Sequence, residues 1–433
     1  MIMNYSFHKV FFRVPNAKVG QVYQGVFKVQ GLEAGQSARL RNLLLPPELG
    51  LVFDEAQQSL LGTPLVAGEY ELALEWSSDD KVWQDGKCPL IVIADPRSLW
   101  KVLEPPFDAP YPKPHSAAQQ LAGGQLLAAS RRGRSHEHAG SFRDDDFFLA
   151  QDAQDSQDSQ DLVSGWSVLL VADGAGSAQC SREGARLAVQ MAGEYLRQKL
   201  APSGALDQEL TRLLADSDLA DSDLASRNAA LEPIFQTLFA DAAKCALDAI
   251  EQEAQANQRV VRDFATTLLA ACVKQQGAQT WVASFWIGDG AIAAYGPRGN
   301  VVLMGTPDSG EYAGQTRFLD RACLAAGPNP ANSASNPPAF TSRVAIACLT
   351  DLSAVFLMTD GVSDPRFETD KGLQDGSKWD ALWDDLAPLL AQQAQQQAQQ
   401  SLLEWLHFFT PGHHDDRTLA IWRSAAAMGG AAA

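Results

Sequence analysis

The stretch Val168-Leu169-Leu170-Val171-Ala172-Asp173-Gly174-Ala175-Gly176-Ser177 decides the fold of this chain. Its first five residues are apolar without alternation, which is typical of a strand buried on both faces. Asp173 follows at the strand end, and the glycines after it let the backbone turn sharply and approach a ligand closely. A carboxylate beside backbone carbonyls suits a hard divalent cation. The simpler interpretation is an Asp that caps the following helix.

The same pattern recurs further along the chain, and this recurrence favours the cation. Residues 354–359 lead into Asp360, residues 285–288 lead into Asp289, and Asp415 lies shortly before the strand-like run 418–422. The acidic triplet 144–146 precedes a further apolar run. Carboxylates gathered at neighbouring strand ends would repel one another in a partly desolvated cleft, so bound cations are the simplest compensation. The candidate ligands are all oxygen donors, which favours magnesium or manganese over zinc.

Five short motifs occur in a fixed order between about residues 120 and 425. They are residues 173–176, 265–268, 287–290, 358–364 and 415–418. Each is weak alone, but together they resemble the metal-dependent protein phosphatases, the protein phosphatase 2C family. The stretches 310–319 and 133–136 look like a bacterial branch of that family whose genes often accompany a Ser/Thr kinase in stress-response clusters.

The resemblance implies an α+β fold, in which a central β-sandwich of two antiparallel sheets is flanked by helices. The residues agree with an α+β class. The runs 291–295 and 301–304 flank a turn and predict a hairpin, and the apolar spacing over 229–256 predicts a long helix. Such hairpins together with long helical blocks are typical of α+β proteins.

The resemblance also assigns roles to site residues. It implies hydrolysis of phosphoserine and phosphothreonine by a water activated at a binuclear Mg²⁺ or Mn²⁺ centre, with Asp173, Asp360 and Asp415 as the catalytic residues. Asp173 would bridge two ions, the Gly174 carbonyl would add a ligand, and Asp360 and Asp415 would hold the first ion. Asp145 and Asp146 would act on the second ion directly or through waters, and Asp289 and Asp364 would form a weaker third site with Asp360.

Two features of the sequence depart from the family pattern. The family's phosphate-binding Arg lies four residues before the first acidic ligand, whereas Arg143 lies two before Asp145. We expect Arg143 to bind phosphate, because a guanidinium binds it through two hydrogen bonds, and Arg134 or Arg131 are the alternatives. Ala175 stands where some relatives carry a His proposed as general acid. His136 and His138 are possible substitutes, and each could equally be an ordinary loop histidine.

Two other functions remain open at this point. Cys180 and Arg186 have the Cys-x5-Arg spacing of cysteine-dependent tyrosine phosphatases, although short motifs match by chance. That mechanism needs a thiolate at a helix N-terminus. The chain could also be a catalytically weak or inactive phosphoprotein-binding module of a stress-response complex, but an Asp at every core metal position argues against this.

The sequence predicts four segments. Residues 1–103 show short β-like runs separated by turn signals and resemble a small all-β immunoglobulin-like sandwich. Residues 104–116 form a proline-rich linker, 117–425 the protein phosphatase 2C-like catalytic domain, and 426–433 a disordered tail. The low-complexity stretches 151–161, 216–225 and 392–400 are predicted surface insertions, and 305–349 falls where relatives carry a mobile flap.

Composition bounds the partners. The formal net charge of -18 makes nucleic acid and anionic membranes poor partners. No signal peptide is apparent, and no apolar run approaches the roughly 20 residues of a membrane span. Six scattered cysteines are typical of reduced core thiols, so we expect a cytoplasmic protein. A phosphoprotein substrate and a cognate Ser/Thr kinase are the expected partners.

Overall fold

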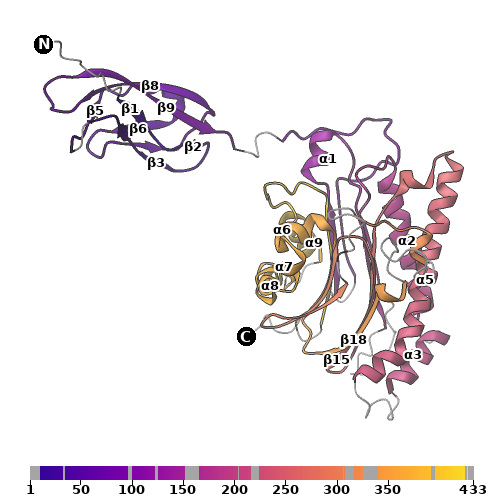
Figure 1. Cartoon of the computed structure of the whole chain (residues 1–433). Coiled ribbons are helices and arrows are strands. Elements are labelled where there is room, and N and C mark those ends of the chain that lie inside the picture. Colours follow the sequence, from indigo (N-terminus) through magenta and orange to yellow (C-terminus); the bar gives the residue numbers. More distant parts are fainter. Residues whose placement is uncertain are drawn as a thin grey trace, which may run out of the picture. The chain divides into compact units, whose positions relative to one another are not determined.

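The computed structural model describes residues 10–32, 35–95, 100–121, 125–151, 165–202, 204–215, 224–305, 307, 316–324, 340–391, 395–424 and 427. The chain divides into two compact units, Met1–Lys101 and Val102–Ala433, which we describe separately (Figure 1). Most of the insertions expected at 151–161 and 216–225, the centre of the expected flap and nearly all of the tail lie outside the described residues.

The smaller unit is all-β, which is consistent with a small sandwich. Its sheets have the strand orders β2-β9-β8-β5, β3-β7-β6 and β1-β4, and β2 pairs with β9 in parallel. They enclose one apolar core that includes Leu40, Leu60 and Leu90. The strands are β1 (Phe11–Arg13), β2 (Ala17–Lys18), β3 (Tyr23–Val26), β4 (Lys28–Gln30), β5 (Arg39–Arg41), β6 (Leu51–Asp54), β7 (Ser59–Gly62), β8 (Gly68–Ser77) and β9 (Gln84–Ile93).

Two antiparallel sheets form the centre of the larger unit. The five-stranded sheet has the order β12-β13-β14-β15-β18, with β12 (Asp146–Gln151), β13 (Ser167–Ala172), β14 (Leu268–Gln276), β15 (Gln279–Ile287) and β18 (Val344–Thr350). The six-stranded sheet has the order β10-β11-β20-β19-β16-β17, with β10 (Ser116–Gln120), β11 (Leu126–Arg131), β20 (Arg417–Arg423), β19 (Ala354–Met358), β16 (Ala291–Gly296) and β17 (Asn300–Gly305).

Helices cover the outer face of each sheet, so the larger unit has four layers (Figure 1). Against the five-stranded sheet lie α2 (Ser181–Lys199), α3 (Ala205–Ala215) and α5 (Leu224–Ala256). Against the six-stranded sheet lie α6 (Asp360–Phe367), α7 (Asp370–Leu373), α8 (Gly376–Leu390) and α9 (Gln395–Trp405). This confirms the predicted β-sandwich flanked by helices. The remaining elements are α1 (Arg134–Ala139) and short 3-10 helices at Pro47–Leu49, Val261–Phe264, Ala322–Leu324 and Phe340–Arg343.

The four layers explain the apolar pattern of β13. Val168 and Leu170 pack toward α2 and α5, whereas Leu169 and Val171 pack between the two sheets. All six residues of this strand are buried. Covering on both faces therefore accounts for the unbroken apolar run Val168–Ala172, even though the neighbouring strands are antiparallel.

The proline-rich segment 104–116 belongs to the larger unit from its start. The Tyr111 ring lies 6.0 Å from the Phe264 ring, and the Tyr111 hydroxyl donates to Glu253 at 2.9 Å. Lys113 Nζ donates to the Asp145 carbonyl at 2.8 Å. The boundary between the units thus falls after Lys101, earlier than the end of the expected linker. Among the described residues, no helix is both long enough and apolar enough to span a membrane.

Candidate metal site

Three carboxylates from different strand ends meet in the larger unit. Asp173 follows β13, Asp289 follows β15, and Asp360 begins α6 directly after β19. One carboxylate oxygen of each lies within 4.8 Å of the other two. Oδ1 of Asp289 and Oδ1 of Asp360 are buried and have no hydrogen-bond partner among the described residues. Buried acceptors without donors are costly, so these two oxygens indicate a place for a cation.

Asp415 and Asp364 adjoin this trio. With Asp360 they line a cavity of about 270 Å³, whose other walls come from Ser135, Gly361, Gly412, His413 and His414. Burial, followed by the charges of Asp415 and Asp289, raises the pKa of Asp360 well above its ordinary value. Burial and Asp289 likewise raise the pKa of Asp364. Carboxylates from both sheets therefore share one electrostatic environment.

Asp145 lies next to Asp173 and is fully buried. Its Oδ2 accepts hydrogen bonds from the hydroxyls of Thr359 at 2.8 Å and Thr418 at 2.7 Å. Its carboxyl group also shares a hydrogen bond with that of Asp173. Burial and then Asp416 raise the pKa of Asp145 to about 7, and burial with Asp360 raises that of Asp173. Two carboxyl groups in such contact hold a proton between them when no cation is present.

The backbone on each side of Asp173 is fixed by the motif at 265–268. Asp173 N–H donates to Thr267 Oγ1 at 2.8 Å, and the Asp173 carbonyl accepts from Thr266 Oγ1 at 2.9 Å and Thr267 N–H at 2.8 Å. Gly174 follows, and a Cβ there would lie 2.9 Å from Ser181 Cβ and 3.0 Å from the Asp144 carbonyl. No larger residue fits, so the chain passes close to α2 without displacing it.

Asp146, the other expected ligand of the second ion, is engaged elsewhere. Its Oδ2 lies 2.9 Å from Lys113 Nζ. Among the described residues, close groups of metal-type ligands are formed by Asp173, Asp289 and Asp360 and by His136, Asp415 and Asp416, and Asp146 belongs to neither. Lys113 is largely buried, so this ion pair holds the segment before β10 against the start of β12. A role of Asp146 at an ion stays a prediction.

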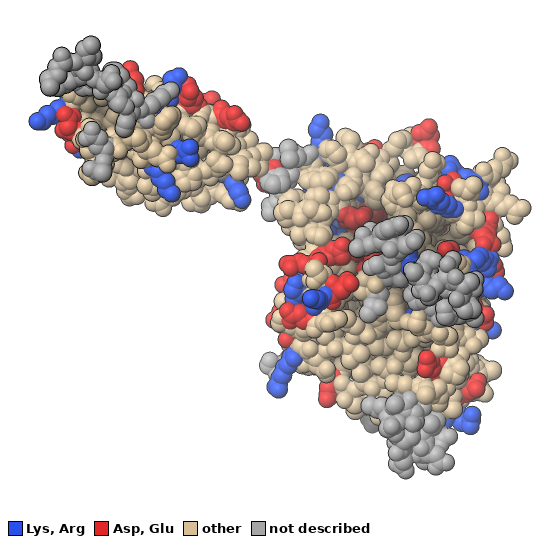
Figure 2. All heavy atoms as spheres, in the orientation of Figure 1, with Lys and Arg blue, Asp and Glu red and all other residues tan. Residues whose placement is uncertain are grey.

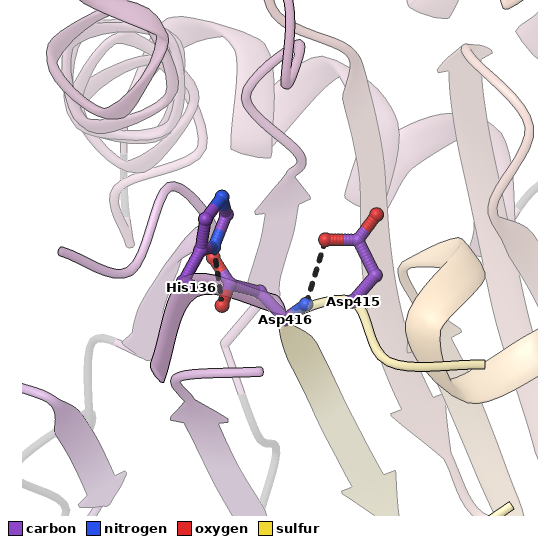
Figure 3. Close-up of side chains that lie close together, drawn as sticks. All are labelled: His136, Asp415 and Asp416. Atoms are coloured by element: carbon purple, nitrogen blue, oxygen red, sulfur yellow. Dashed lines mark hydrogen bonds and ion pairs between the residues drawn. The ribbon is translucent and has the colours of Figure 1, made fainter. Parts of the chain in front are cut away.

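Asp416 connects three segments around the site and is 1% exposed. Its Oδ1 accepts from Gly133 N–H at 2.5 Å, and its Oδ2 accepts from Asp144 N–H at 2.5 Å. Oδ1 also lies 2.9 Å from His136 Nδ1 (Figure 3). Burial lowers the pKa of His136, but the charge of Asp416 outweighs it, and the pKa rises to about 9. Asp416 thus binds α1 and the acidic triplet to the start of β20, next to Asp415.

The candidate phosphate-binding arginines differ in exposure. Arg143 is 1% exposed, and its guanidinium donates to the Asp145 carbonyl at 2.8 Å. This burial argues against the phosphate contact that we expected for Arg143. Arg131 donates to the Leu403 carbonyl at 3.4 Å. Arg134 is partly exposed, precedes the cavity residue Ser135, and stacks on Phe409 at 5.4 Å.

Cys180 is unsuited to nucleophilic chemistry. It is fully buried at the N-cap of α2, and burial raises the pKa of its thiol. A nucleophilic cysteine needs the opposite, a lowered thiol pKa at an accessible position. The geometry therefore disfavours the tyrosine-phosphatase mechanism.

Sequence reasoning missed several residues that hold the site. Thr359, Thr418 and Asp416 belong to the motifs at 358–364 and 415–418 but carry no individual expected role, and Lys113 carries none either. A signal existed for Thr359, which lies between the end of an apolar strand and the expected ligand Asp360, and for Thr418, which is part of the motif at 415–418. Lys113 gave no signal, because its partner lies 33 residues further along the chain.

The donor set fits magnesium or manganese. It consists of carboxylate oxygens on short side chains, and among these Asp145 accepts from two threonine hydroxyls and Asp415 accepts from the backbone N–H of Asp416. Hard divalent cations take such oxygen ligands, and outer hydrogen bonds orient them.

Comparisons with known proteins agree with this chemistry. A family described as Protein phosphatase 2C matches residues 132–407. Serine/threonine-protein phosphatase 3 of Escherichia coli (strain K12) is 34% identical over 151 residues, which are 35% of this chain and 47% of that protein. The chain thus matches about half the length of this curated relative.

Solved structures of bacterial phosphatases are also similar. The S. agalactiae serine/threonine phosphatase has a TM-score of 0.37 at 14% identity, over 71% of this chain and 100% of that one. The catalytic domain of the serine threonine protein phosphatase PstP in complex with two manganese ions has a TM-score of 0.35 at 12% identity, over 71% of this chain and 98% of that one.

Proposed function

This chain belongs to the protein phosphatase 2C family, and on that premise we propose that it is a metal-dependent phosphatase of phosphoserine and phosphothreonine in proteins. One observation carries the proposal. Asp173, Asp289 and Asp360 come from three separate strand ends and bring carboxylate oxygens within 4.8 Å of one another. Two of those residues have a buried oxygen without a partner among the described residues. Such an arrangement is unfavourable unless a cation is bound.

The proposed ligand roles follow from position. Asp173 and Asp360 would hold the ions together with Asp289, and Asp415 and Asp364 would complete the open side along the cavity. Asp145 lies close enough to Asp173 to share a proton with it, so it would act on an ion directly or through water. Two divalent cations bound there would neutralise phosphate oxygens and lower the pKa of a water molecule for in-line attack.

Other residues of the chain would orient the carboxylates and contact the phosphate. Thr266 and Thr267 fix the backbone of Asp173, and the hydroxyls of Thr359 and Thr418 fix Asp145, so the carboxylates are oriented before substrate arrives. We place the phosphate in the cavity beside Asp360 and Asp415. Arg134 is our candidate for the residue that contacts it, because it is partly exposed and adjoins the cavity residue Ser135.

The proposal extends to context. A cytoplasmic location agrees with six cysteines that are all free thiols. A cognate Ser/Thr kinase would supply the phosphoprotein substrate. Phosphate transfer by such a kinase onto the chain's substrate, followed by removal only when this protein and Mn²⁺ are present, would support that partnership.

Phosphate release from phosphoserine, phosphothreonine and phosphotyrosine peptides tests the function, with Mn²⁺, Mg²⁺ or a chelator present. We expect release from the first two peptides, loss with chelator, and at least a hundredfold loss in Asp173→Asn and Asp360→Asn. Asp384→Asn on the exposed face of α8 is the matched control and should retain full activity. Tight peptide binding without turnover in either metal would instead indicate the inactive binding module. Phosphotyrosine release that Cys180→Ser abolishes would indicate the cysteine mechanism.

A further inference from the structure

A threonine hydroxyl occupies one side of Asp289. Thr316 Oγ1 donates a hydrogen bond to Asp289 Oδ2. The other oxygen, Oδ1, is buried and has no hydrogen-bond partner among the described residues. Asp289 is also one of the three residues whose carboxylate oxygens converge. The hydroxyl therefore engages one oxygen of this carboxylate and leaves the other for a cation.

The segment that carries Thr316 is anchored at two further points. Leu319 N–H donates to the Thr266 carbonyl at 2.8 Å, and the Leu319 side chain is buried. Arg321 donates to Glu251 of α5 at 2.8 and 2.7 Å, and also to Asp248. Paired donors from one guanidinium hold a carboxylate in a fixed geometry. The hydrogen bonds of Leu319 and Arg321 therefore hold the backbone that follows Thr316 in place.

The same anchor reaches a second ligand. Thr266, which accepts from Leu319, itself donates to the Asp173 carbonyl at 2.9 Å. The stretch 316–321 therefore connects α5 to the supports of both Asp173 and Asp289. It overlaps the stretch 310–319, which has no role in the proposed reaction.

We propose that Thr316 is a positioning residue that restricts Asp289 to one-oxygen coordination and so favours Mg²⁺ and Mn²⁺ over Ca²⁺ at this site. The proposal rests on the proposed metal-dependent function. Mg²⁺ requires near-octahedral coordination with short metal–oxygen distances, which single carboxylate oxygens provide. Ca²⁺ takes more ligands and often both oxygens of a carboxylate. A hydroxyl that holds Oδ2 opposes that two-oxygen mode.

Titration calorimetry of the metal-free full chain with Mn²⁺ and with Ca²⁺ tests the proposal in Thr316→Val and Thr316→Ser. Valine keeps the shape of threonine without its hydroxyl, and serine keeps the hydroxyl. Loss of an outer hydrogen-bond partner typically weakens metal binding ~10–100-fold. We expect Thr316→Val to bind Mn²⁺ at least ~10-fold more weakly and to show a smaller ratio of Mn²⁺ affinity to Ca²⁺ affinity. Thr316→Ser should have the same affinities as the unmodified chain.

Thr237→Val is the matched control, because the exposed Thr237 donates its hydroxyl to the Pro233 carbonyl of its own helix, with no other partner among the described residues. It should leave both affinities unchanged. If Thr316→Val does not fold, Thr316→Ala takes its place as the variant without the hydroxyl. Equal Mn²⁺ affinity and equal Mn²⁺/Ca²⁺ preference in the hydroxyl-free and unmodified chains would overturn the role of Thr316. Failure of the unmodified chain to bind Mn²⁺ would instead overturn the proposed function.

Discussion

His136 Nδ1 lies 2.9 Å from Asp416 Oδ1, and Asp416 is the residue next to Asp415 at the start of β20 (Figure 3). Asp416 points away from the cavity that Asp415 lines, toward α1 and the acidic triplet. Its pKa is lowered, because the charge and hydrogen bond of His136 together with two backbone N–H donors outweigh the effect of burial. The pKa of Asp415 is raised, first by burial and then by Asp416. Two adjacent aspartates therefore have opposite roles, one structural and one at the site.

Exchange of each aspartate for asparagine should separate these roles. Asp416→Asn replaces an acceptor by an NH₂ group that faces a backbone N–H, so we expect a loss of about 3 kcal/mol in the free energy of unfolding. Asp415→Asn removes a charge from a repelling group, so the metal-free protein should be equally stable or more stable, while Mn²⁺ affinity falls strongly. Urea unfolding and Mn²⁺ titration measure both effects. Equal destabilisation by both changes would contradict the assignment.

The stability of the metal-free protein should fall as the pH rises from about 6 to 9. Asp145 has its pKa raised to about 7 in the folded state, so its burial becomes more costly as pH rises through 7. His136 has its pKa raised to about 9, so the stability from its pairing with Asp416 is fully present below about 6.5 and lost as pH rises through 9. Both signs agree. Thermal unfolding in chelator across this range measures the effect, and a melting temperature that rises toward pH 9 would contradict it.

Binding of Mn²⁺ should release protons. Asp145 and Asp173 share a hydrogen bond and have raised pKa values, so a proton held between them near neutral pH must leave when a cation binds. Calorimetry at pH 6.5 in buffers of different ionisation enthalpy should show a net release of about one proton, and a smaller release at pH 8.5. Heats that do not depend on the buffer would show that no proton is held there.

Lys113→Ala tests whether the segment before β10 belongs to the larger unit. The change leaves Asp146 without its 2.9 Å partner, and Lys113 also donates to the Asp145 carbonyl. Removal of one member of a largely buried ion pair typically costs ~3–5 kcal/mol in unfolding free energy. Lys371→Ala, at an exposed position in α7, is the control and should change stability by less than about 0.5 kcal/mol. A cost for Lys113→Ala no larger than that of the control would show that the segment is only a linker.

The distribution of charge agrees with a cation site more than with an anionic partner. In Figure 2 acidic side chains gather on the larger unit in the region where Figure 1 draws α6 and α9. Among the described residues, Oδ1 of Asp360, the first residue of α6, and Oδ1 of Asp289 have no hydrogen-bond partner. Part of the acidic excess behind the net charge of -18 therefore lies near the cavity.

Parts of the fold could be predicted from the sequence where the residue pattern of one segment is enough to identify a buried strand or a hairpin. β19 is apolar at every position and β13 at every position after Ser167, and the hairpin of β16 and β17 has a clear turn between its strands. Strands β6 and β7 of the smaller unit were not predicted as a pair, because they are short and only partly buried, and the intervening turn has no glycine.

The site was predictable only as a set of carboxylates. Asp173, Asp289 and Asp360 each follow an apolar run, so local patterns identify them. Asp289 was expected to form a weaker third site with Asp360 and Asp364; the structure brings its carboxylate close to those of Asp360 and Asp173, and its role at an ion stays a prediction. The burial of Arg143 could not be foreseen, because it depends on the fold of the segment that contains Pro114 around the guanidinium. Partners that lie far apart in sequence, such as Thr316 and Asp289, require the tertiary structure.

Anomalous diffraction from a crystal of the full chain soaked in Mn²⁺ tests the central claim most directly. We predict anomalous peaks among the carboxylates of Asp173, Asp289 and Asp360, with Asp415 on the open side, and no such peaks in Asp173→Asn. Strong manganese peaks elsewhere, with none between these three carboxylates, would contradict the account.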